Sequence, residues 1–569
     1  MNLCKGMRGS HGRLCLLLCV ALSASAGVAN AQTIPNSGEL LQEAPRPAQA
    51  PPSSSPGLTI QQAHQSTIDS GDTFLVKHIV ISGNSLLPTA DLHLLVASGE
   101  GKILSFTDLE NLAARITRSY QNHGFLLSRA YIPAQTLSND TVRIEVLEAR
   151  YGDLVLSNSS KVSDALLKSY LQPLKSGQPV VEDSLERSLL LLSDIPGAVV
   201  TSALAPGTAP GASDLQVTAT PGAPYTGSVA LDDGGNRYTG RTRVSATASF
   251  NNSLHEGDVL SVTGLTAGAD LDYGRLGYQT LINNGEGTTL GAAVSSLYYH
   301  LANGLTDLHA SGTADVEGLT LMQPLIRSIA GNLFVQLGFD NKQLRDEIDS
   351  TDIHTDRRTD ALTMTLAGDH RDASGIFNMN AGLTFGRLEF DNAAAELADS
   401  ESARTRGDYG KFTLSLARLQ GLSESNSLYL AFDGQLANRN LDSSEQFFLG
   451  GPNSVRAYDV GSVGGAMGGL LSAELRHTLV LPVPGAWQAI AFVDSGVVRI
   501  YKDQFTPGEN HANLSGVGAG LNWVGVGGWT ASIALAAPIG GRPRLAGDSA
   551  SSRVWFEFRK SFGAGSVSR

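Results

Sequence analysis

Apolar and polar side chains alternate along many short segments between Pro224 and the C-terminus. In residues 333–340 and 428–435, an apolar residue occupies every second position, and the positions between include Asp340 and Asp433. A period of two predicts β-strands with one apolar and one polar face. A membrane barrel with a water-filled lumen has such strands, and so has a soluble β-sandwich. The alternation alone therefore leaves both architectures open.

The length of this region indicates how many strands it can hold. At roughly 20 residues for each strand with its turn, residues 225–562 give room for about 16 strands, an even number as in bacterial barrels. One uncharged stretch, residues 512–541, is long enough to be taken for a membrane helix. It carries glycine at positions 516, 518, 520, 525, 527 and 528. Because each glycine weakens a helix, we interpret the stretch as a β-hairpin that turns at residues 525–528.

The region before the barrel shows a β-α-α-β-β order twice. Two repeats of this order predict two small α+β domains rather than one larger enzyme domain. In the first repeat, the second helix is expected to open with a capping box formed by Thr107 and Glu110. The expected elements are 74–81, a helix from Thr89, a helix ending at Gly124, 125–132 and 141–146, and then 152–157, 163–171, 181–192, 198–203 and 214–219.

The N-terminus has the order of a secretory signal peptide. Basic residues come first, an apolar run spans residues 14–22, and small residues end at Ala31, which predicts cleavage before Gln32. The apolar run is shorter than the roughly 20 residues of a membrane-spanning helix, which disfavours an uncleaved anchor. All three cysteines lie within the signal, so the mature chain forms no disulfide. An exported chain that spans a membrane without a helix must use a closed barrel.

Composition and motifs exclude several function classes. The chain has a formal charge of −13, which argues against a nucleic-acid partner. It contains neither a nucleophile elbow nor a zinc-binding H-E-x-x-H motif, and Gly101-Lys102 lacks the other residues of a phosphate loop. The twelve histidines show no metal-ligand spacing. We therefore expect no catalytic residues, no metal and no cofactor.

These observations divide the chain into five parts. After the signal, a short helix-competent piece around residues 37–43 is followed by a tract rich in proline and serine, which behaves as an extended linker. The expected boundaries are 1–31 for the signal peptide, 32–72 for the helix and linker, 73–149 and 150–223 for the two α+β domains, and 224–569 for the barrel.

Two local motifs in the barrel region give the chain a family resemblance. The stretch from Phe448 to Tyr458 reads FLGGPNSVRAY, and residues 492–496 read FVDSG. With the order of its parts, the chain resembles the outer-membrane transporters of two-partner secretion, the haemolysin activation and secretion proteins. In that family the loop motif usually reads Val-Arg-Gly-Tyr, so Ala457 is a departure that puts the loop backbone there in question. The resemblance implies two POTRA domains before a 16-stranded barrel.

The resemblance also implies a lock between a loop and the barrel wall. The sixth extracellular loop would fold back into the lumen, where Arg456 would pair with Asp494. Alternation independently places Phe492, Asp494 and Gly496 on one side of a strand and Val493 on the other, lipid-facing side. We expect the loop–barrel lock to consist of Arg456, Asp494, Val455, Tyr458, Phe492 and Gly496.

The function implied by the resemblance is export of one dedicated, large exoprotein across the bacterial outer membrane, without nucleotide hydrolysis. The unfolded exoprotein would dock on POTRA domains in the periplasm, by adding a strand to a sheet edge or by lying in a helix–strand groove. Other expected partners are outer-membrane lipid and the barrel-assembly machinery. Two alternatives remain: a barrel-assembly insertase of the same superfamily, and a barrel-anchored enzyme or porin.

Overall fold

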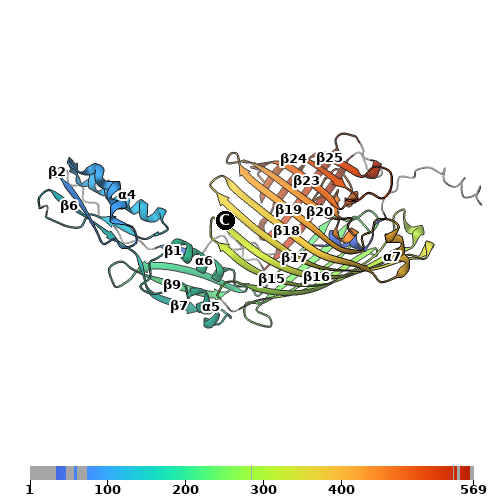
Figure 1. The fold of residues 1–569 in the computed structure, drawn as a ribbon, viewed down its shortest axis with the longest axis horizontal. Coiled ribbons are helices and arrows are strands. Elements are labelled where there is room, and N and C mark those ends of the chain that lie inside the picture. The colour runs from blue at the N-terminus through green and yellow to red at the C-terminus, as the bar shows by residue number, and fades with distance from the viewer. Residues whose placement is uncertain are drawn as a thin grey trace, which may run out of the picture.

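The structure is a computed structural model that describes residues 34–45, 57–60, 73–136, 138–282, 285–541, 544–546 and 552–563. Two α+β units lie at one end of a closed β-barrel (Figure 1). The expected signal peptide, residues 1–31, lies outside the described residues, and so do the linker residues 46–56 and 61–72.

The first α+β unit packs two helices on short β-sheets. Its long helix buries one face, including Leu112 and Ile116, against the strands. The expected strand 74–81 is divided into two strands at Lys77, because its two halves pair with different partners. Residues 73–76 pair with residues 102–105, a strand that the sequence did not predict, and residues 78–82 pair with residues 141–145. The elements are β2 (Thr73–Val76), β3 (His78–Ser82), α3 (Thr89–Val96), β4 (Lys102–Ser105), α4 (Phe106–Asn122), β5 (Arg129–Tyr131) and β6 (Thr141–Leu147).

The capping box of α4 differs from the expected one. The Ser105 hydroxyl accepts a hydrogen bond from the Asp108 backbone N–H at 3.2 Å, and the Asp108 carboxylate accepts one from the Ser105 backbone N–H at 3.0 Å. The expectation for Thr107 and Glu110 was therefore wrong, since both lie inside the helix. The box begins two residues earlier because β4 runs directly into α4 at Ser105.

The second α+β unit places two helices on a four-stranded sheet of order β1-β8-β9-β7. Its β1 comes from the linker region and lies parallel to β8, with Leu58 opposite Ser202. The sequence did not predict this added strand. The elements are β1 (Leu58–Ile60), β7 (Arg150–Asn158), α5 (Asp164–Leu171), α6 (Glu182–Ser193), β8 (Ala198–Pro206) and β9 (Ala212–Pro221).

The barrel has sixteen antiparallel strands, and its first and last strands, β10 and β27, pair to close it. The predicted fold class is confirmed. Its strands are β10 (Tyr225–Asp232), β11 (Arg243–Asn251), β12 (Val259–Thr266), β13 (Leu271–Leu281), β14 (Thr289–His300), β15 (Ala310–Arg327), β16 (Gly331–Ile348), β17 (Ile353–Asp372), β18 (Gly375–Phe390), β19 (Gly407–Gly421), β20 (Asn426–Ala437), β23 (Met467–Leu479), β24 (Ala486–Arg499), β25 (His511–Val524), β26 (Trp529–Pro538) and β27. The last of these spans Arg553–Phe562.

Burial alternates along the barrel strands as the sequence pattern indicated. In β24, residues 490, 492, 494, 496 and 498 are buried inside the barrel, whereas residues 491, 493, 495 and 497 are exposed on its outside. The stretch 512–541 forms β25 and β26 with a turn between them, as expected. No helix within the described ranges has the length and apolar character needed to cross a membrane.

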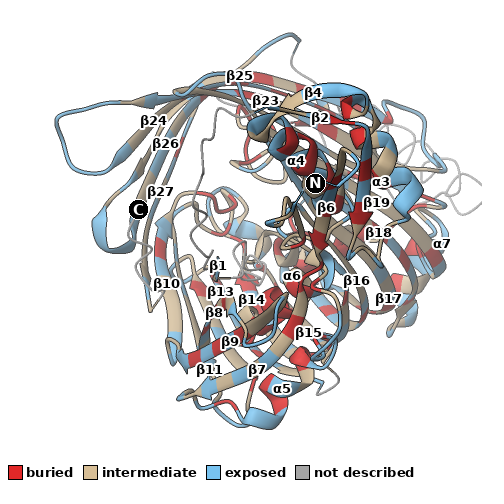
Figure 2. Ribbon diagram, turned by 90° about the vertical axis from the view of Figure 1, so that its left-hand side faces the viewer, coloured by how far each residue is buried: buried red, intermediate tan, exposed pale blue. Residues whose placement is uncertain are grey.

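The second α+β unit is fastened to the strand connections at its end of the barrel. Arg327 at the end of β15 donates to both carboxylate oxygens of Asp194, at 2.8 and 2.9 Å. Arg187 of α6 pairs with Glu286 at 2.8 Å, and the Ser163 backbone N–H donates to Glu256 at 2.6 Å. Figure 2 views this arrangement from the side of the two units. These contacts fix the unit beside the opening of the barrel.

Candidate functional site in the barrel lumen

The connection between β20 and β23, residues 438–466, folds back into the lumen; we call it loop 6. It contains a short helical turn, η5 (Ser443–Glu445), and two short paired strands, β21 (Phe447–Leu449) and β22 (Val463–Gly465). Leu449, Val455 and Tyr458 are buried against the inner faces of β24 and β25. The loop therefore fills space inside the barrel instead of extending away from it.

Arg456 lies at the centre of the polar contacts of loop 6. Its Nε and Nη2 donate to the two carboxylate oxygens of Asp494, each at 2.8 Å, and its backbone N–H donates to the same carboxylate at 3.2 Å. Its guanidinium also lies 3.3 Å from the centroid of the Phe492 ring. The Asp494 side chain has no exposed surface. A bidentate pair satisfies such a buried carboxylate, which would be costly without a partner.

Two further residues, Glu474 and Trp555, contact Arg456, and Arg476 in turn pairs with Glu474; the predicted site did not include these three residues. Glu474 of β23 accepts from Arg456 Nη1 at 2.8 Å and from Arg476 Nε at 2.7 Å. Trp555 of β27 donates from Nε1 to the Arg456 carbonyl at 2.7 Å. Glu474 and Arg476 occupy one face of their strand, so the period-two pattern was the signal that could have placed them in the lumen.

The remaining expected lock residues surround this pair. The Tyr458 backbone N–H donates to the Val455 carbonyl at 3.1 Å, which closes a turn around Arg456. Gly496 leaves room for the Leu449 side chain, since an added Cβ would lie 2.6 Å from it. The structure thus brings all six expected lock residues to one part of the lumen.

Ala457 is fully buried in the place where a glycine is usual. Its φ is not positive, so the backbone there needs no glycine. The facing residue on β25 is Gly516, where an added Cβ would come within 2.5 Å of the Ala457 Cβ. The methyl group of Ala457 is accommodated because the opposite strand has no side chain at this point.

A short helix, α2 (Ser37–Glu43), also lies inside the barrel, near the end remote from the α+β units (Figure 1). The Asn36 side chain caps it by accepting from the backbone N–H groups of Gly38 and Glu39. Leu40 is fully buried against apolar side chains of the wall. The helix is thus enclosed by the barrel through both polar and apolar contacts.

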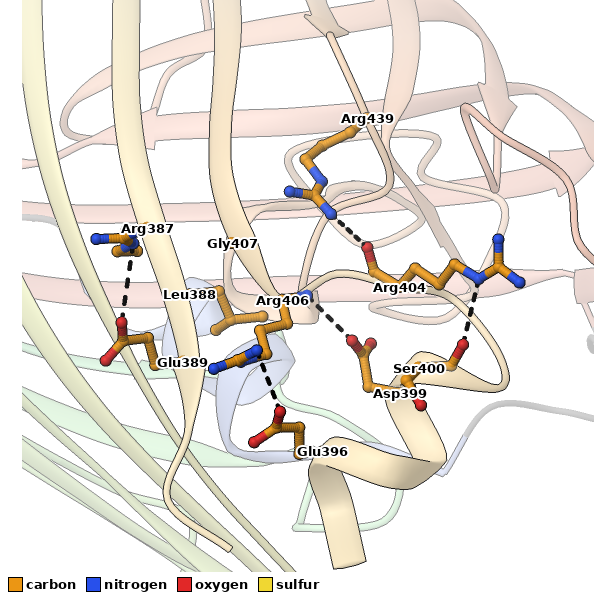
Figure 3. A pocket seen from close by; sticks show the side chains of 10 residues that line it. All are labelled: Arg387, Leu388, Glu389, Glu396, Asp399, Ser400, Arg404, Arg406, Gly407 and Arg439. Carbon is orange, nitrogen blue, oxygen red and sulfur yellow. Dashed lines mark hydrogen bonds and ion pairs between the residues drawn. The ribbon is translucent and has the colours of Figure 1, made fainter. Parts of the chain in front are cut away.

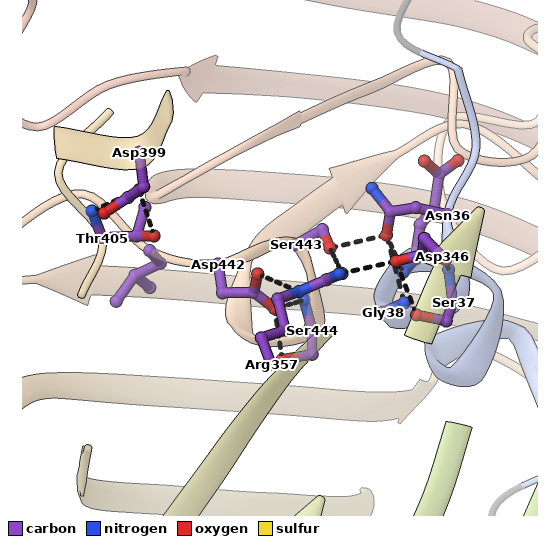
Figure 4. A network of polar contacts seen from close by, with 12 residues as sticks. Asn36, Ser37, Gly38, Asp346, Arg357, Asp399, Thr405, Asp442, Ser443 and Ser444 are labelled. Carbon is purple, nitrogen blue, oxygen red and sulfur yellow. Dashed lines mark hydrogen bonds and ion pairs between the residues drawn. The ribbon is translucent and has the colours of Figure 1, made fainter. Parts of the chain in front are cut away.

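The helix and loop 6 share one polar network with the barrel wall (Figure 4). The backbone N–H and hydroxyl of Ser37 donate to Asp346 of β16, at 2.7 and 2.9 Å. Arg357 of β17 pairs with the same Asp346 at 2.6 Å and with Asp442 of loop 6 at 2.7 Å. The Ser443 hydroxyl donates to Asn36 Oδ1 at 2.6 Å. Arg357 therefore links the anchor of the helix to the anchor of the loop.

A second pair of contacts holds the helical turn of loop 6 on the wall. Glu445 pairs with Lys342 at 2.5 Å and with Lys411 at 2.7 Å. Its side chain is only 3% exposed, and the two ammonium groups compensate for its burial. The turn and the Arg456 contact are two separate attachments of one loop.

A hollow outside this network lies beside α7 (Ala393–Ser400), in the connection between β18 and β19 (Figure 3). Its volume is about 350 Å³, and its charged groups pair with one another, as Arg406 does with Glu396 at 3.1 Å and Arg387 with Asp408 at 3.1 Å. Within the described ranges, no group of three or more acidic, histidine or cysteine side chains could hold a metal ion. The lumen is therefore the strongest candidate site.

Known proteins resemble this chain over most of its length. A family model described as haemolysin secretion/activation protein ShlB/FhaC/HecB matches residues 211–523, and one described as POTRA domain, ShlB-type, matches residues 74–149. The heme/hemopexin transporter protein HuxB of Haemophilus influenzae strain 86-028NP is 27% identical over 469 residues, which cover 81% of this chain and 82% of HuxB. The outer membrane transporter CdiB of Escherichia coli is 26% identical over 518 residues, covering 88% and 85%.

Solved structures show the same fold. CdiB from Escherichia coli matches with a TM-score of 0.67 and 23% identity, covering 88% of this chain and 93% of CdiB. CdiB from Acinetobacter baumannii matches with a TM-score of 0.59 and 18% identity, covering 97% of each chain. The matches confirm the predicted family, the outer-membrane location and the periplasmic position of the POTRA region. The chain belongs to the haemolysin secretion/activation protein family of outer-membrane transporters, which serve two-partner secretion.

Proposed function

We propose that this transporter exports one dedicated exoprotein, unfolded, through a lumen that is closed at rest by α2 and loop 6. It acts as a channel rather than as an enzyme and needs no nucleotide. The observation that carries the proposal is the shared network in which Arg357 contacts both Asp346 and Asp442. Because side-chain contacts hold α2 and loop 6 in the lumen, both can be withdrawn from it without breaking the backbone hydrogen bonds between the barrel strands.

In this proposal α2 is a plug that can be withdrawn. It is a single helix of seven residues, and the linker residues 46–56 separate it from the next described segment. Its N-terminal polar anchors are Ser37 and its cap Asn36, which bind Asp346 and Ser443. At its C-terminal end Gln42 donates to the Ser443 and Gln446 carbonyls, and Glu43 accepts from Asn236. Releasing them costs a few hydrogen bonds, each worth roughly 1–3 kcal/mol when a charged group takes part.

Removing the plug should open the channel. We expect deletion of residues 32–56 to raise the single-channel conductance in planar bilayers, because the lumen loses α2 while the strand ladder stays complete. A matched control replaces only residues 46–56 with a flexible sequence of the same length and should keep the low conductance. Unchanged conductance after the deletion would show that α2 does not block the path.

The exoprotein is captured, in this proposal, on the sheets of the two α+β units. An extended segment can add to a sheet edge because edge strands have unpaired backbone groups. One edge of the second unit, β8, already carries β1 from the linker over the three pairs from Leu58–Ser202 to Ile60–Leu204. An incoming strand at this edge would have to displace β1, which lies in the same linker as the plug.

Two soluble fragments can test this capture. A fragment of residues 72–222 lacks β1, whereas a fragment of residues 57–222 contains it. Both should bind the unfolded N-terminal region of the cognate exoprotein, and the longer fragment should bind more weakly if β8 is the docking edge. Equal affinities would assign docking to another edge or to a helix–strand groove. No binding by either fragment at high micromolar concentration would exclude capture by these units.

Two further partners belong to the same proposal. Outward residues of the barrel, such as Val493 and Leu535, are exposed and apolar, as contact with outer-membrane lipid requires. The barrel-assembly machinery would insert the chain by recognising its last strand, β27, which ends on Phe562.

A further inference from the structure

The barrel closes along a short seam between β10 and β27. The two strands pair over six positions, from Gly227–Phe562 to Asp232–Glu557. Other neighbouring strands of the barrel pair over at least eight positions, and β16 and β17 pair over eighteen. The closing seam therefore has the fewest ladder contacts in the wall.

Beyond the last paired position, one carboxylate of loop 6 joins both sides of the seam. Asp459 accepts from Arg241 Nη1 at 2.5 Å and lies 3.8 Å from Arg237 Nη1, and both arginines belong to residues 233–242, the loop that follows β10. It also pairs with Arg553, the first residue of β27. The Asp459 residue is only 8% exposed.

The charge balance makes this carboxylate decisive for the cluster. Three guanidinium groups converge on Asp459, and Asp233 also attracts Arg241, so loss of Asp459 leaves the cations in excess and they repel one another across the seam. At this end of the seam, Asp233 and Phe556 form two direct hydrogen bonds. The Asp233 backbone N–H donates to the Phe556 carbonyl at 3.3 Å, and the Phe556 backbone N–H donates to the Asp233 carboxylate at 2.7 Å. The attraction of Asp459 thus replaces ladder contacts that the seam lacks.

We propose that Asp459 is a positioning residue that clasps the closing seam through loop 6. It lies three residues after Arg456, so the same turn of the loop binds β23 and β24 on one side and the seam on the other. Withdrawal of loop 6 from the lumen then loosens the seam in the same step. This inference concerns the barrel wall and holds whether or not α2 acts as a plug.

The test uses a disulfide staple across the seam. Ser228 and Ser561 are directly paired and both face the lumen, so Ser228→Cys with Ser561→Cys suits disulfide geometry in a mature chain that has no other cysteine. The measurement is the temperature at which the full-length barrel unfolds in detergent, with the staple oxidised or reduced. Asp459→Asn should lower this temperature by several degrees in the reduced barrel and leave the stapled barrel unchanged.

Companion variants separate charge from shape. Asp459→Glu should keep most of the stability, and Arg553→Gln added to Asp459→Asn should restore part of the loss, because it removes one repelling charge. Asp408→Asn, at an exposed extracellular ion pair outside the seam, is the matched control and should change nothing. The proposal is wrong if Asp459→Asn behaves like Asp408→Asn, if it destabilises stapled and reduced barrels equally, or if Arg553→Gln brings no recovery.

Discussion

In the second α+β unit, the leucines of α5 and α6 fill the interior, whereas in the barrel the interior holds Arg357, Glu445 and Asp494. The barrel places Val493, Leu535 and Phe556 on its outside instead. The same chain thus folds against two solvents. In the periplasm, apolar side chains gain from leaving water, while in the membrane the apolar surface faces lipid and polar groups face a lumen.

The difference teaches how each region can move. A core of leucines is non-directional and resists opening over its whole surface. The contents of the lumen are held by directional ion pairs and hydrogen bonds in addition to apolar packing, so the loss of single charged side chains can weaken their attachment. The periplasmic units are therefore suited to hold a substrate, and the lumen to change its occupancy.

The largest expected effect comes from the lumen. Arg456→Ala leaves the buried Asp494 without its charged partner, while Glu474 keeps Arg476, and this removes about 3–5 kcal/mol of the interaction that holds loop 6. Secretion should fall strongly while the protein still reaches the outer membrane, because loop 6 takes no part in the strand ladder. Asp494→Ala should resemble it, and the double mutant should be less than additive. The measurement is secreted exoprotein in the four strains.

Two results would contradict this coupling. Normal secretion by both single mutants would reduce Arg456 to an ordinary loop charge. Residual secretion in the double mutant equal to the product of the two single fractions would show that the residues act independently. The outer-membrane level of each variant is the control, because a drop there would indicate failed assembly.

A slightly smaller effect is expected in the apolar core. Leu189 of α6 is fully buried, so Leu189→Ala should lower the free energy of unfolding of a fragment of residues 73–222 by about 2–5 kcal/mol. Val199→Ala on β8 is the matched control, since Val199 is 51% exposed. Chemical denaturation of the three proteins measures the difference. Equal losses would mean that the interior of this unit is less tightly packed than the structure shows.

The smallest effect concerns a buried charge between the two periplasmic units. Burial of Glu148 opposes ionisation, but hydrogen bonds from Ser85, Leu86 and Tyr120 outweigh it and lower the pKa of the Glu148 carboxyl. Because the folded state has the lower pKa, Glu148 stabilises the fold above the ordinary pKa of glutamate. This contribution is lost as the pH falls through the lowered, folded-state value.

Glu148→Gln keeps the shape of the side chain and removes this dependence. At neutral pH the variant should be less stable by on the order of 1 kcal/mol, and the difference should shrink as the pH falls below the ordinary pKa of glutamate and through the lowered, folded-state value. Unfolding of the fragment of residues 73–222 at several pH values measures it. Asp153→Asn, at an exposed position, is the matched control and should leave the free energy of unfolding at neutral pH unchanged. A constant difference across the range would rule out ionisation as the cause.

The sequence by itself determined the parts of this protein that depend on local periodicity. Period-two alternation predicted the barrel strands, because each strand must present one face to lipid and one to the lumen. The same alternation placed Asp494 inward and Val493 outward. Helix periodicity located α4 and α6, although the cap of α4 at Ser105 was missed because a short strand adjoins it.

Only the tertiary structure decided which distant residues meet. No local pattern connects Ser37 with Asp346, or Leu58 with Ser202. The same holds for Asp459 with Arg241 and Arg553. These contacts join residues that are 94 to 309 positions apart in the chain. Alternation could have placed Glu474 in the lumen, but it could not have made Glu474 a partner of Arg456. Charged side chains pair only where the backbone brings them close together. In this barrel, strand register and the path of loop 6 decide which charges meet, and alternation along one strand encodes neither.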